Sequence, residues 1–326
     1  MRHASTSAAV LQAADIGSSW VDLPWLLRQE QRAAGLALHA YRPRSSILAG
    51  RQASRVRGRG LNFEELRGYL PGDDVRHIDW KATQRSGKPL VRTYTEERDR
   101  PALIVLDQRI NMFFGSQRAL KSVAAAELAA LAAWLSLQSH DRVGGIVFED
   151  VAIHTIAPLR SRQRVQALLA QIVRSNQALN AASSARPQDG QLDKALEAAL
   201  RVAHHDHLVC VISDFADASG RTRQLLRALA EHNDVVAVLV SDPLLQNLPA
   251  RAGQMVLTEG ELQIELDMRR LRQPVEQYFA QRQADVAALL QRSGVPLLPL
   301  STHLDVLEQL RGFIARNAAP ARSVPL

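Results

Sequence analysis

The sequence contains one cysteine, Cys210, so no disulfide bond can form within a single chain. This excludes the small disulfide-stabilised scaffolds that are typical of secreted proteins. Cys210 lies in the apolar run HLVCVISD at 207–214, where a lone cysteine behaves as a small hydrophobic residue. A reducing compartment suits such a chain, and we expect a cytoplasmic protein.

Long hydrophobic runs are also missing. The longest apolar helix candidate, at 123–137, is interrupted by Glu127 and is too short for a bilayer core of about 30 Å. The first twenty residues include Asp15 and have no continuous apolar core, which argues against a signal peptide. We therefore expect no membrane span.

The motifs of common nucleotide-binding and hydrolytic sites are incomplete. The stretch GRG at 58–60 lacks the third glycine of a dinucleotide-binding loop, and SGKP at 86–89 has proline where a phosphate-binding loop needs serine or threonine. No G-x-S-x-G stretch is present, and Ser213 has no adjacent histidine that could activate it. These absences argue against nucleotide binding and serine-based catalysis.

The chain is otherwise ordinary for a globular protein, with 326 residues of which 46% are hydrophobic and 22% charged. Its formal charge of +7 is uneven, because residues 1–59 carry nine arginines against three acidic residues. A basic arm can bind nucleic acid or an anionic surface, but this one lacks the interleaved aromatic residues of a nucleic-acid-binding site. We expect a solvated, loosely attached arm with one helix at 23–36, and we do not expect nucleic acid as a partner.

Apolar runs alternate with helical patterns after residue 100, which predicts an α/β protein with a doubly wound, mostly parallel sheet. The strand at 151–156 is expected to pair antiparallel at one edge. Strands are predicted at 91–95, 103–106, 142–148, 151–156, 207–213, 234–240, 255–257, 262–266 and 295–300, and helices at 117–138, 161–174, 192–203, 220–232, 271–292 and 304–315. The expected domains are a basic N-terminal arm at 1–53, a subdomain rich in glycine, proline and charge at 54–100, a core at 101–243, and a C-terminal hairpin, helices and last strand at 244–326.

The subdomain at 54–100 contains Pro71-Gly72, a strong signal for a type II turn. Charged residues surround this turn, namely Arg67, Asp73, Asp74, Arg76 and Asp79. Because arginine presents a planar fork to carboxylates, we expect charge-assisted hydrogen bonds that pin the loop, in a signature network that also includes Trp80. Catalysis by Asp73 and Asp74 is the less favoured alternative, since no nucleophile or cofactor motif accompanies them.

Two strands of the predicted sheet end on an acidic residue. Asp107 follows the run at 103–106, and Asp214 closes the run at 207–213. In open α/β sheets, ligands bind outside the carboxyl ends of the strands, at the crevice where the strand order reverses. We expect Asp107 and Asp214 to lie close together there.

The segment GRGLNFEELRGYLPGDDVRHIDW at 58–80 resembles the bacterial and archaeal family called domain of unknown function fifty-eight. The family's hallmark is the string G-x-G-x-x-F-x-x-L-R-x-Y-x-P-G-D-D-x-R-x-I-D-W, which this chain matches through to Trp80. The likeness continues through the α/β body to SDPLLQNLP at 241–249 and LPLSTHLDVLEQL at 298–310.

This resemblance implies a von Willebrand factor A-like domain. Such domains often hold Mg²⁺ through a D-x-S-x-S stretch after the first strand, a threonine from a second loop and an aspartate after the fourth strand. Asp107 and Asp214 keep the first and last positions, whereas Arg109, Asn111 and Gln191 replace the two serines and the threonine. Because a guanidinium repels a cation, we expect a degenerate site with no metal and no cofactor, in which Arg109 reaches between the two aspartates in place of the ion.

Proteins that resemble this one usually accompany a MoxR-type AAA+ ATPase. The implied function is non-enzymatic, as an adapter or partner of such an ATPase and its protein clients in a chaperone-like or assembly system. Binding would use the rim at 107–115, where Met112, Phe113 and Phe114 form an apolar patch if exposed and join the core if not. Two alternatives stay open, namely nucleic-acid binding through the arginine-rich arm and a metal-dependent hydrolase that uses Asp73, Asp74, Asp107 or Asp214.

Overall fold

The computed structural model describes residues 19–36, 61–70, 73–96, 100–180, 188–245, 254–259 and 262–318. The chain divides into two compact units, of which one comprises residues 1–45 and 100–326 and the other residues 46–99. We call them the core unit and the signature unit. The signature unit is thus inserted between two parts of the sequence that fold together.

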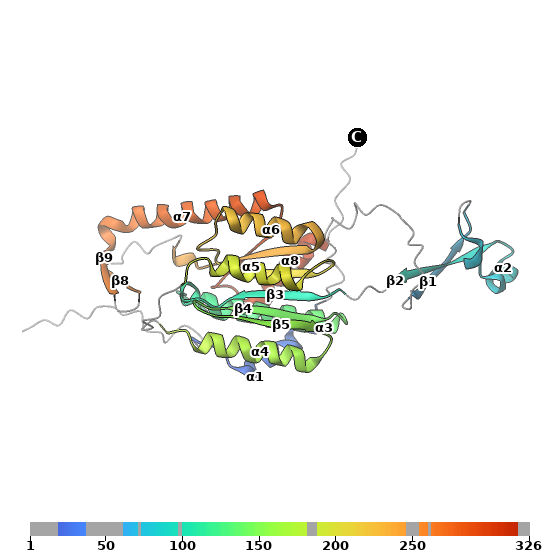
Figure 1. Ribbon diagram of the computed structural model, residues 1–326, viewed down its shortest axis with the longest axis horizontal. Coiled ribbons are helices and arrows are strands. Elements are labelled where there is room, and N and C mark those ends of the chain that lie inside the picture. Colours follow the sequence, from blue (N-terminus) through green and yellow to red (C-terminus); the bar gives the residue numbers. More distant parts are fainter. Residues whose placement is uncertain are drawn as a thin grey trace, which may run out of the picture. The chain divides into compact units, whose positions relative to one another are not determined.

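The core unit is built around a central sheet (Figure 1). The sheet has six strands in the order β10-β7-β6-β3-β4-β5. All neighbouring pairs are parallel except β4 and β5, which pair antiparallel at one edge. The strands are β3 Ala102–Asp107, β4 Val143–Phe148, β5 Ile153–Leu159, β6 Leu208–Ser213, β7 Asp234–Ser241 and β10 Leu297–Ser301. The predicted doubly wound sheet with an antiparallel edge strand is confirmed.

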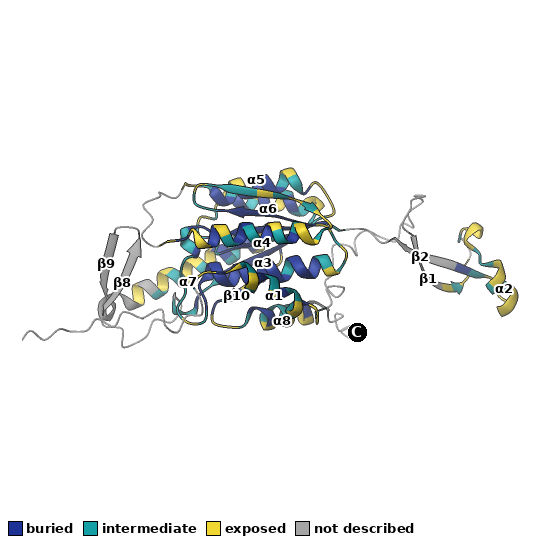
Figure 2. Ribbon diagram, turned by 90° about the horizontal axis from the view of Figure 1, so that it is seen from below, coloured by how far each residue is buried: buried dark blue, intermediate teal, exposed yellow. Residues whose placement is uncertain are grey.

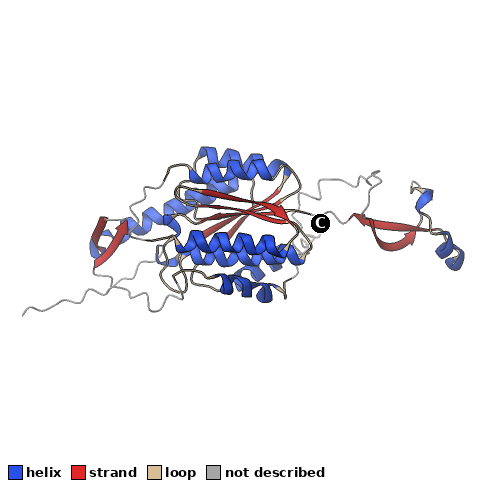
Figure 3. Ribbon diagram, turned by 60° about the horizontal axis from the view of Figure 1, so that its bottom comes forward, coloured by secondary structure: helices blue, strands red, loops and turns tan. Residues whose placement is uncertain are grey.

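Helices cover both faces of this sheet (Figure 3). One face packs against α1 Leu23–Ala33, α3 Lys121–Gln138, α4 Arg162–Gln177 and α8 Val306–Ala318, and the other against α5 Gln191–Val202, α6 Gly220–His232 and α7 Met268–Ser293. Along β3, Ile104 and Leu106 belong to the first layer of the core, and Leu103 and Val105 to the second. Because both faces are buried, the strand is a continuous apolar run rather than an alternating one.

The first helix corrects the expectation of a loosely attached arm. Leu26 and Ala33 of α1 are fully buried, and the indole of Trp134 on α3 donates a hydrogen bond of 3.2 Å to the carbonyl oxygen of Leu26. Glu127 is fully buried in α3, and the Arg32 guanidinium lies 2.5 Å from its carboxylate. A buried carboxylate needs a counter-charge, so α1 belongs to the core unit. The rest of segment 1–53 lies outside the described residues.

Two features show how closely the core unit is packed. A Cβ atom on Gly145 of β4 would lie 2.5 Å from Cδ1 of Leu168 on α4, so only glycine lets helix and sheet approach this far. Cys210 lines a small apolar pocket of about 80 Å³ beside α3 and α8, and burial raises the pKa of its thiol to about 12. The cysteine is therefore the inert hydrophobic residue that its sequence context predicts.

The remaining elements of the core unit largely follow the predicted pattern. The predicted C-terminal hairpin is present as β8 Gln254–Glu259 and β9 Leu262–Asp267, and short 3₁₀ turns occur at η4 Ile110–Met112 and η5 Pro243–Leu245. The helix predicted from residue 117 begins later, at Lys121. Within the described residues, no helix has the length and hydropathy needed to cross a membrane.

The signature unit consists of β1 Leu61–Gly68, η3 Val75–His77, α2 Trp80–Ser86 and β2 Leu90–Glu96. Strands β1 and β2 pair antiparallel, which confirms the strand predicted at 91–95. Strand β1 and helix α2 were not predicted from the sequence. The sequence LNFEELRG of β1 carries more charge than is typical of a strand. The turn predicted at Pro71-Gly72 lies outside the described residues.

Candidate functional site

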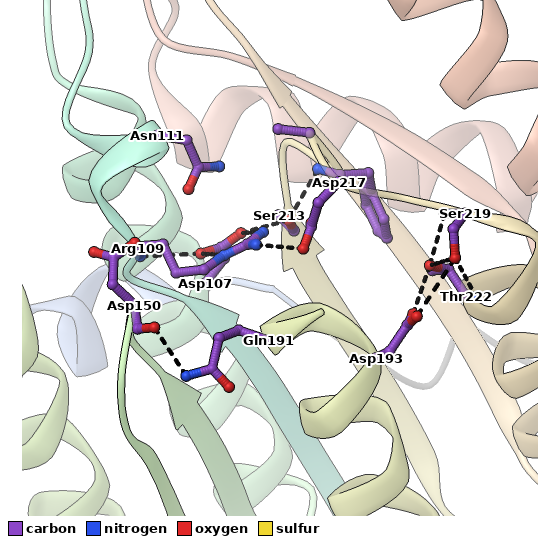
Figure 4. Close-up of polar contacts among 12 residues, drawn as sticks. Asp107, Arg109, Asn111, Asp150, Gln191, Asp193, Ser213, Asp217, Ser219 and Thr222 are labelled. Carbon is purple, nitrogen blue, oxygen red and sulfur yellow. Dashed lines mark hydrogen bonds and ion pairs between the residues drawn. The ribbon is translucent and has the colours of Figure 1, made fainter. Parts of the chain in front are cut away.

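Asp107 is the last residue of β3 and is fully buried at the carboxyl edge of the sheet (Figure 4). Its Oδ1 accepts hydrogen bonds of 3.0 Å from the backbone N–H and from Nε of Arg109. Its Oδ2 accepts from Nη2 of Arg109 at 2.7 Å and from the hydroxyl of Ser213 at 2.6 Å. A carboxylate offers about four acceptor positions, so this chain's own donors fill all of them.

Arg109 lies between two carboxylates, of which Asp107 is the predicted one and Asp217 stands in place of the predicted Asp214. Its Nη1 atom lies 2.7 Å from Oδ2 of Asp217, while Nη2 and Nε hold Asp107 (Figure 4). The guanidinium also stacks 5.2 Å above the ring of Phe148. The residue is only 6% exposed, so it is a buried counter-ion and not a solvated side chain.

Asp214 has a separate set of partners, and the prediction that Arg109 reaches it is wrong. Its Oδ2 lies 2.5 Å from Nζ of Lys121, at the start of α3. Its Oδ1 accepts hydrogen bonds from Nδ2 of Asn111 at 2.6 Å and from the backbone N–H of Ala216 at 3.0 Å. Because Lys121 already neutralises Asp214, the guanidinium pairs with Asp217, three residues farther along the loop.

Burial and pairing act in opposite directions on these groups. Desolvation raises the pKa of the Asp107 carboxyl, and Arg109 counters this by pairing with the charged form. Burial alone lowers the pKa of Arg109, but Asp107 and Asp217 raise it above its ordinary value. The arginine therefore carries its positive charge inside the folded protein.

Asp150, in the turn after β4, is a further acidic residue at this edge. Its Oδ2 accepts a hydrogen bond of 2.9 Å from the backbone N–H of Ile110, whereas its buried Oδ1 has no partner within the described residues. Burial raises the pKa of this carboxyl. Gln191, predicted at the threonine position, donates from Nε2 to the backbone oxygen of Asp150 at 3.0 Å and is not bonded to Asp107 or Asp214.

The rim at 107–115 is fixed at its far end by another buried carboxylate. Asp242, just after β7, accepts from the backbone N–H of Ser116 at 2.9 Å and from its hydroxyl at 2.6 Å. It also accepts from the hydroxyl of Thr302, after β10, at 2.5 Å and from the N–H of Leu244 at 2.9 Å. The loop after β3 is thus held at both ends by carboxylates with four donors each.

The three apolar residues of the rim do not form a continuous exposed patch. Met112 is fully buried, whereas Phe113 and Phe114 are half-buried. The ring of Phe113 lies 6.1 Å from the ring of Trp20, just before α1. The sequence left open whether these residues form an exposed patch or join the core. Met112 joins the core, and Phe113 is partly covered by the segment before α1.

Sequence reasoning missed several side chains of this edge, namely Lys121, Asp150, Ser213, Asp217 and Asp242. Lys121 carried a usable signal, because a lysine in the first turn of a helix opposes the helix dipole unless an acid lies nearby. Asp217 and Asp150 lie in turns whose paths do not follow from local pattern. Within the described residues, no group of three His, Cys, Asp or Glu side chains is arranged to hold a metal ion.

The charged residues of the signature unit form local pairs. Arg67 donates two hydrogen bonds to Asp73, of 2.9 and 2.7 Å, and Asp73 also accepts from the N–H of Leu70 at 2.8 Å. Arg76 forms an exposed fork with Asp74. The hydrogen bonds from Arg67 lower the pKa of Asp73, and those from Arg76 lower that of Asp74 to about 2.

The last two residues of the predicted network behave differently. Asp79 caps α2 by accepting from the backbone N–H of Ala82 at 3.0 Å. Trp80, the first residue of α2, is 68% exposed. The network therefore shapes the loop and the start of the helix, and the tryptophan is presented to its surroundings.

Comparison with known proteins places the chain among relatives without assigned functions. The model of the family described as "Protein of unknown function DUF58" matches residues 65–288. The chain is 30% identical over 272 residues, 82% of its length and 83% of theirs, to "Uncharacterized protein Rv1480" of Mycobacterium tuberculosis and "Uncharacterized protein Mb1516" of Mycobacterium bovis. It is also 30% identical over 128 residues to "Uncharacterized protein MAV169" of Mycobacterium avium, which covers 38% of this chain and 75% of that protein.

Proposed function

The chain belongs to the DUF58 family, whose description assigns no function, and from this premise we propose that it is a non-enzymatic protein-interaction module. Its partner is a MoxR-type AAA+ ATPase, together with the protein clients of that ATPase. The core unit serves as a von Willebrand factor A-like domain with a degenerate metal site. The carboxyl edge of the sheet contacts the partner without an ion.

One observation carries this proposal: the four acceptor positions of Asp107 are filled by Arg109 and Ser213. A metal-dependent binding or hydrolytic site needs carboxylate oxygens that are free to converge on a cation. Here a guanidinium supplies the positive charge, and it is fixed in place by Asp217 and by the ring of Phe148. The arrangement favours a permanently shaped contact surface over metal-dependent chemistry.

The rigidity of the rim supports the same function. Asp107 and Asp242 each accept hydrogen bonds both from the loop after β3 and from a residue of, or just after, another strand of the sheet. A loop that is already ordered loses less conformational entropy when it binds. The choice of an AAA+ ATPase as partner rests on the family resemblance of the signature segment at 58–80.

A binding assay with the cognate MoxR-type ATPase tests the proposal. We expect association at micromolar concentration or tighter, and we expect Asp189→Lys, an exposed change beside the carboxyl edge, to weaken it by about tenfold. The matched control is Glu231→Lys, an equally exposed charge reversal near the amino end of β7. Absence of binding both with and without ATP would overturn the assignment of the partner.

Calorimetric titration with Mg²⁺ and Mn²⁺ tests the degenerate metal site separately. We expect no binding at millimolar concentrations, because Asp107 has no acceptor position left. Binding that is lost in Asp107→Ala would instead favour the metal-dependent hydrolase. This outcome concerns only the chemistry of the site and would leave an ATPase interaction, if observed, intact.

A further inference from the structure

The described side chains of the signature unit form little hydrophobic core (Figure 2). Among the side chains described in it, those of 66–70 and 73–91, only Val91 is buried. A two-stranded sheet is at best marginally stable alone, and a unit of this size rarely buries enough apolar surface to fold without additional contacts. The exposed apolar side chains of this unit are therefore candidates for contact with another molecule.

Large apolar side chains are concentrated on the outside of this unit. Leu66 is 38% exposed, Leu70 60%, Val75 57% and Trp80 68%. They account for four of the nine large exposed hydrophobic residues in the described parts of the chain, yet they fall within fifteen consecutive positions. Such a concentration is typical of an interaction site, whereas single exposed apolar residues are normal.

The charged residues of the signature hold these apolar side chains in position. Asp73 accepts from the N–H of Leu70 at 2.8 Å, and its own N–H donates to the carbonyl of Leu70 at 3.0 Å. Asp74 caps the turn that begins at Val75, and Asp79 caps the helix that begins at Trp80. Each exposed apolar residue from 70 to 80 thus follows or contacts an aspartate that fixes its backbone, so the surface is ordered before it binds.

Among the described side chains around these residues, the charges without an ionic partner are those of lysine and arginine. Lys81 and Arg85 lie on α2 and Lys88 follows it, all three are exposed, and none forms an ion pair within the described part of the chain. The acidic residues Asp73 and Asp74 are already paired with arginines. A partner with acidic residues beside an apolar groove would complement both properties.

We infer that residues 66–70 and 73–88 form a docking surface for another protein whose apolar contact site is flanked by aspartate or glutamate. A protein partner fits better than a nucleic acid, because leucine and valine cannot stack on bases and Trp80 is the one exposed aromatic residue among the described side chains of this unit. It also fits better than a membrane, because α2 has seven residues and no continuous apolar face. This inference concerns a different unit from the rim at 107–115 and does not depend on the proposed ATPase interaction.

Photocrosslinking in the native host tests this surface in the full chain. Benzoylphenylalanine replaces Trp80, and in a matched control it replaces Tyr278, an aromatic residue of the core unit that is 60% exposed. We expect position 80 to crosslink to a segment of another protein in which apolar residues alternate with or adjoin acidic ones, as identified by mass spectrometry. Position 278 should not capture that segment.

Charge reversal completes the test. Lys81→Glu with Arg85→Glu should lower the crosslinking yield at position 80 by about tenfold or more, whereas Arg85→Lys should not. Both residues are exposed and unpaired within the described residues, so these changes leave the loop intact. Capture of the protein's own core unit, of nucleic acid or of lipid, capture of a segment without acidic residues, or a yield no higher than at position 278 would each overturn the inference.

Discussion

The core unit and the signature unit use charged and apolar residues in opposite ways. In the core unit, apolar residues fill both faces of the sheet and the charges at its carboxyl edge are buried with fixed counter-ions, as with Arg109 and Asp107. In the signature unit, the ion pairs of Asp73 and Asp74 are partly or largely exposed, and Trp80 and Leu70 point outward. The first unit is stabilised from within, whereas the second is shaped for contact.

This contrast shows that an ion pair can have two different roles in one chain. A buried pair gains little net stability when it forms, yet removal of one partner leaves an uncompensated charge that is very costly. An exposed pair contributes little to global stability, but it can fix the geometry of a loop. The four predictions below test this contrast, in order of decreasing effect.

The largest effect is expected from Arg109→Met. It leaves the fully buried carboxylate of Asp107 without its counter-ion and should lower the free energy of unfolding by about 3–5 kcal/mol. Urea denaturation of the full chain measures the loss. The matched control is Arg162→Met, because Arg162 also makes a forked pair, with Glu30, and stacks 5.1 Å above Trp134, but it is exposed. Arg162→Met should lower the free energy of unfolding by about 1 kcal/mol or less. Equal decreases in the two variants would contradict the difference between buried and exposed ion pairs.

Close packing is expected to matter only in the core unit. In Gly145→Ala the new Cβ would meet Cδ1 of Leu168 at 2.5 Å, which should cost about 1–3 kcal/mol. In Gly68→Ala, at the end of β1, nothing lies within 4 Å of the new atom. The free energy of unfolding of this second variant, measured by thermal denaturation, should therefore differ from that of the parent protein by less than about 0.5 kcal/mol. A loss in Gly68→Ala as large as in Gly145→Ala would show that both units are equally tightly packed.

A smaller effect is expected at Asp150, whose pKa burial raises. A carboxyl with a raised pKa binds more protons in the folded than in the unfolded state, so stability increases as the pH falls through the interval between the two pKa values. Asp150→Asn removes this contribution and should flatten the pH dependence above pH 4. It should raise stability at pH 7 by less than about 1 kcal/mol, since the group is half-exposed to screening solvent. Urea midpoints of the variant and of the parent protein, measured at several pH values, test this prediction. If the midpoint changes with pH equally in both proteins, the prediction is wrong.

The smallest effect is expected from Arg76→Ala. The exposed pair with Asp74 should not influence the unfolding of the core unit, but its loss should raise the pKa of Asp74 from about 2 toward the ordinary value of 3.8. In the parent protein, the contribution of this pair is present above the ordinary pKa and is lost as the pH falls toward 2. A titration of the carboxyl carbon followed by NMR measures the shift. Asp73, held by Arg67, serves as the internal control and should keep its lowered pKa.

The sheet and the position of its acidic residues could be predicted because they depend on local pattern. Asp107 and Asp214 each end a continuous apolar run, and the carboxyl ends of neighbouring parallel strands must meet at one edge. The pairing of Arg109 could not be predicted in the same way. Asp214 and Asp217 both lie in the loop after β6, and Asp214 is already paired with Lys121, which approaches from the start of α3.

Two other errors have related causes. Strand β1 was missed because Arg67, a charged residue, pairs with the buried Val91 of β2. Strand prediction depends on an alternation of apolar and polar residues, and this charge interrupts it. The docking of α1 was missed because it depends on a buried acid in another helix, Glu127, ninety-five residues away from Arg32. Contacts of this kind are set by tertiary packing and leave no periodic signal in either segment.

The insertion of residues 46–99 between α1 and β3 has a consequence for proteolysis. Helix α1 is tied to α3 by Arg32 and Glu127 and, through Arg32 and Asp305, to the segment before α8. A protease that cuts the signature unit would therefore sever the backbone without separating the halves. The nicked polypeptide should elute from a sizing column at its original volume and split into two fragments only in detergent.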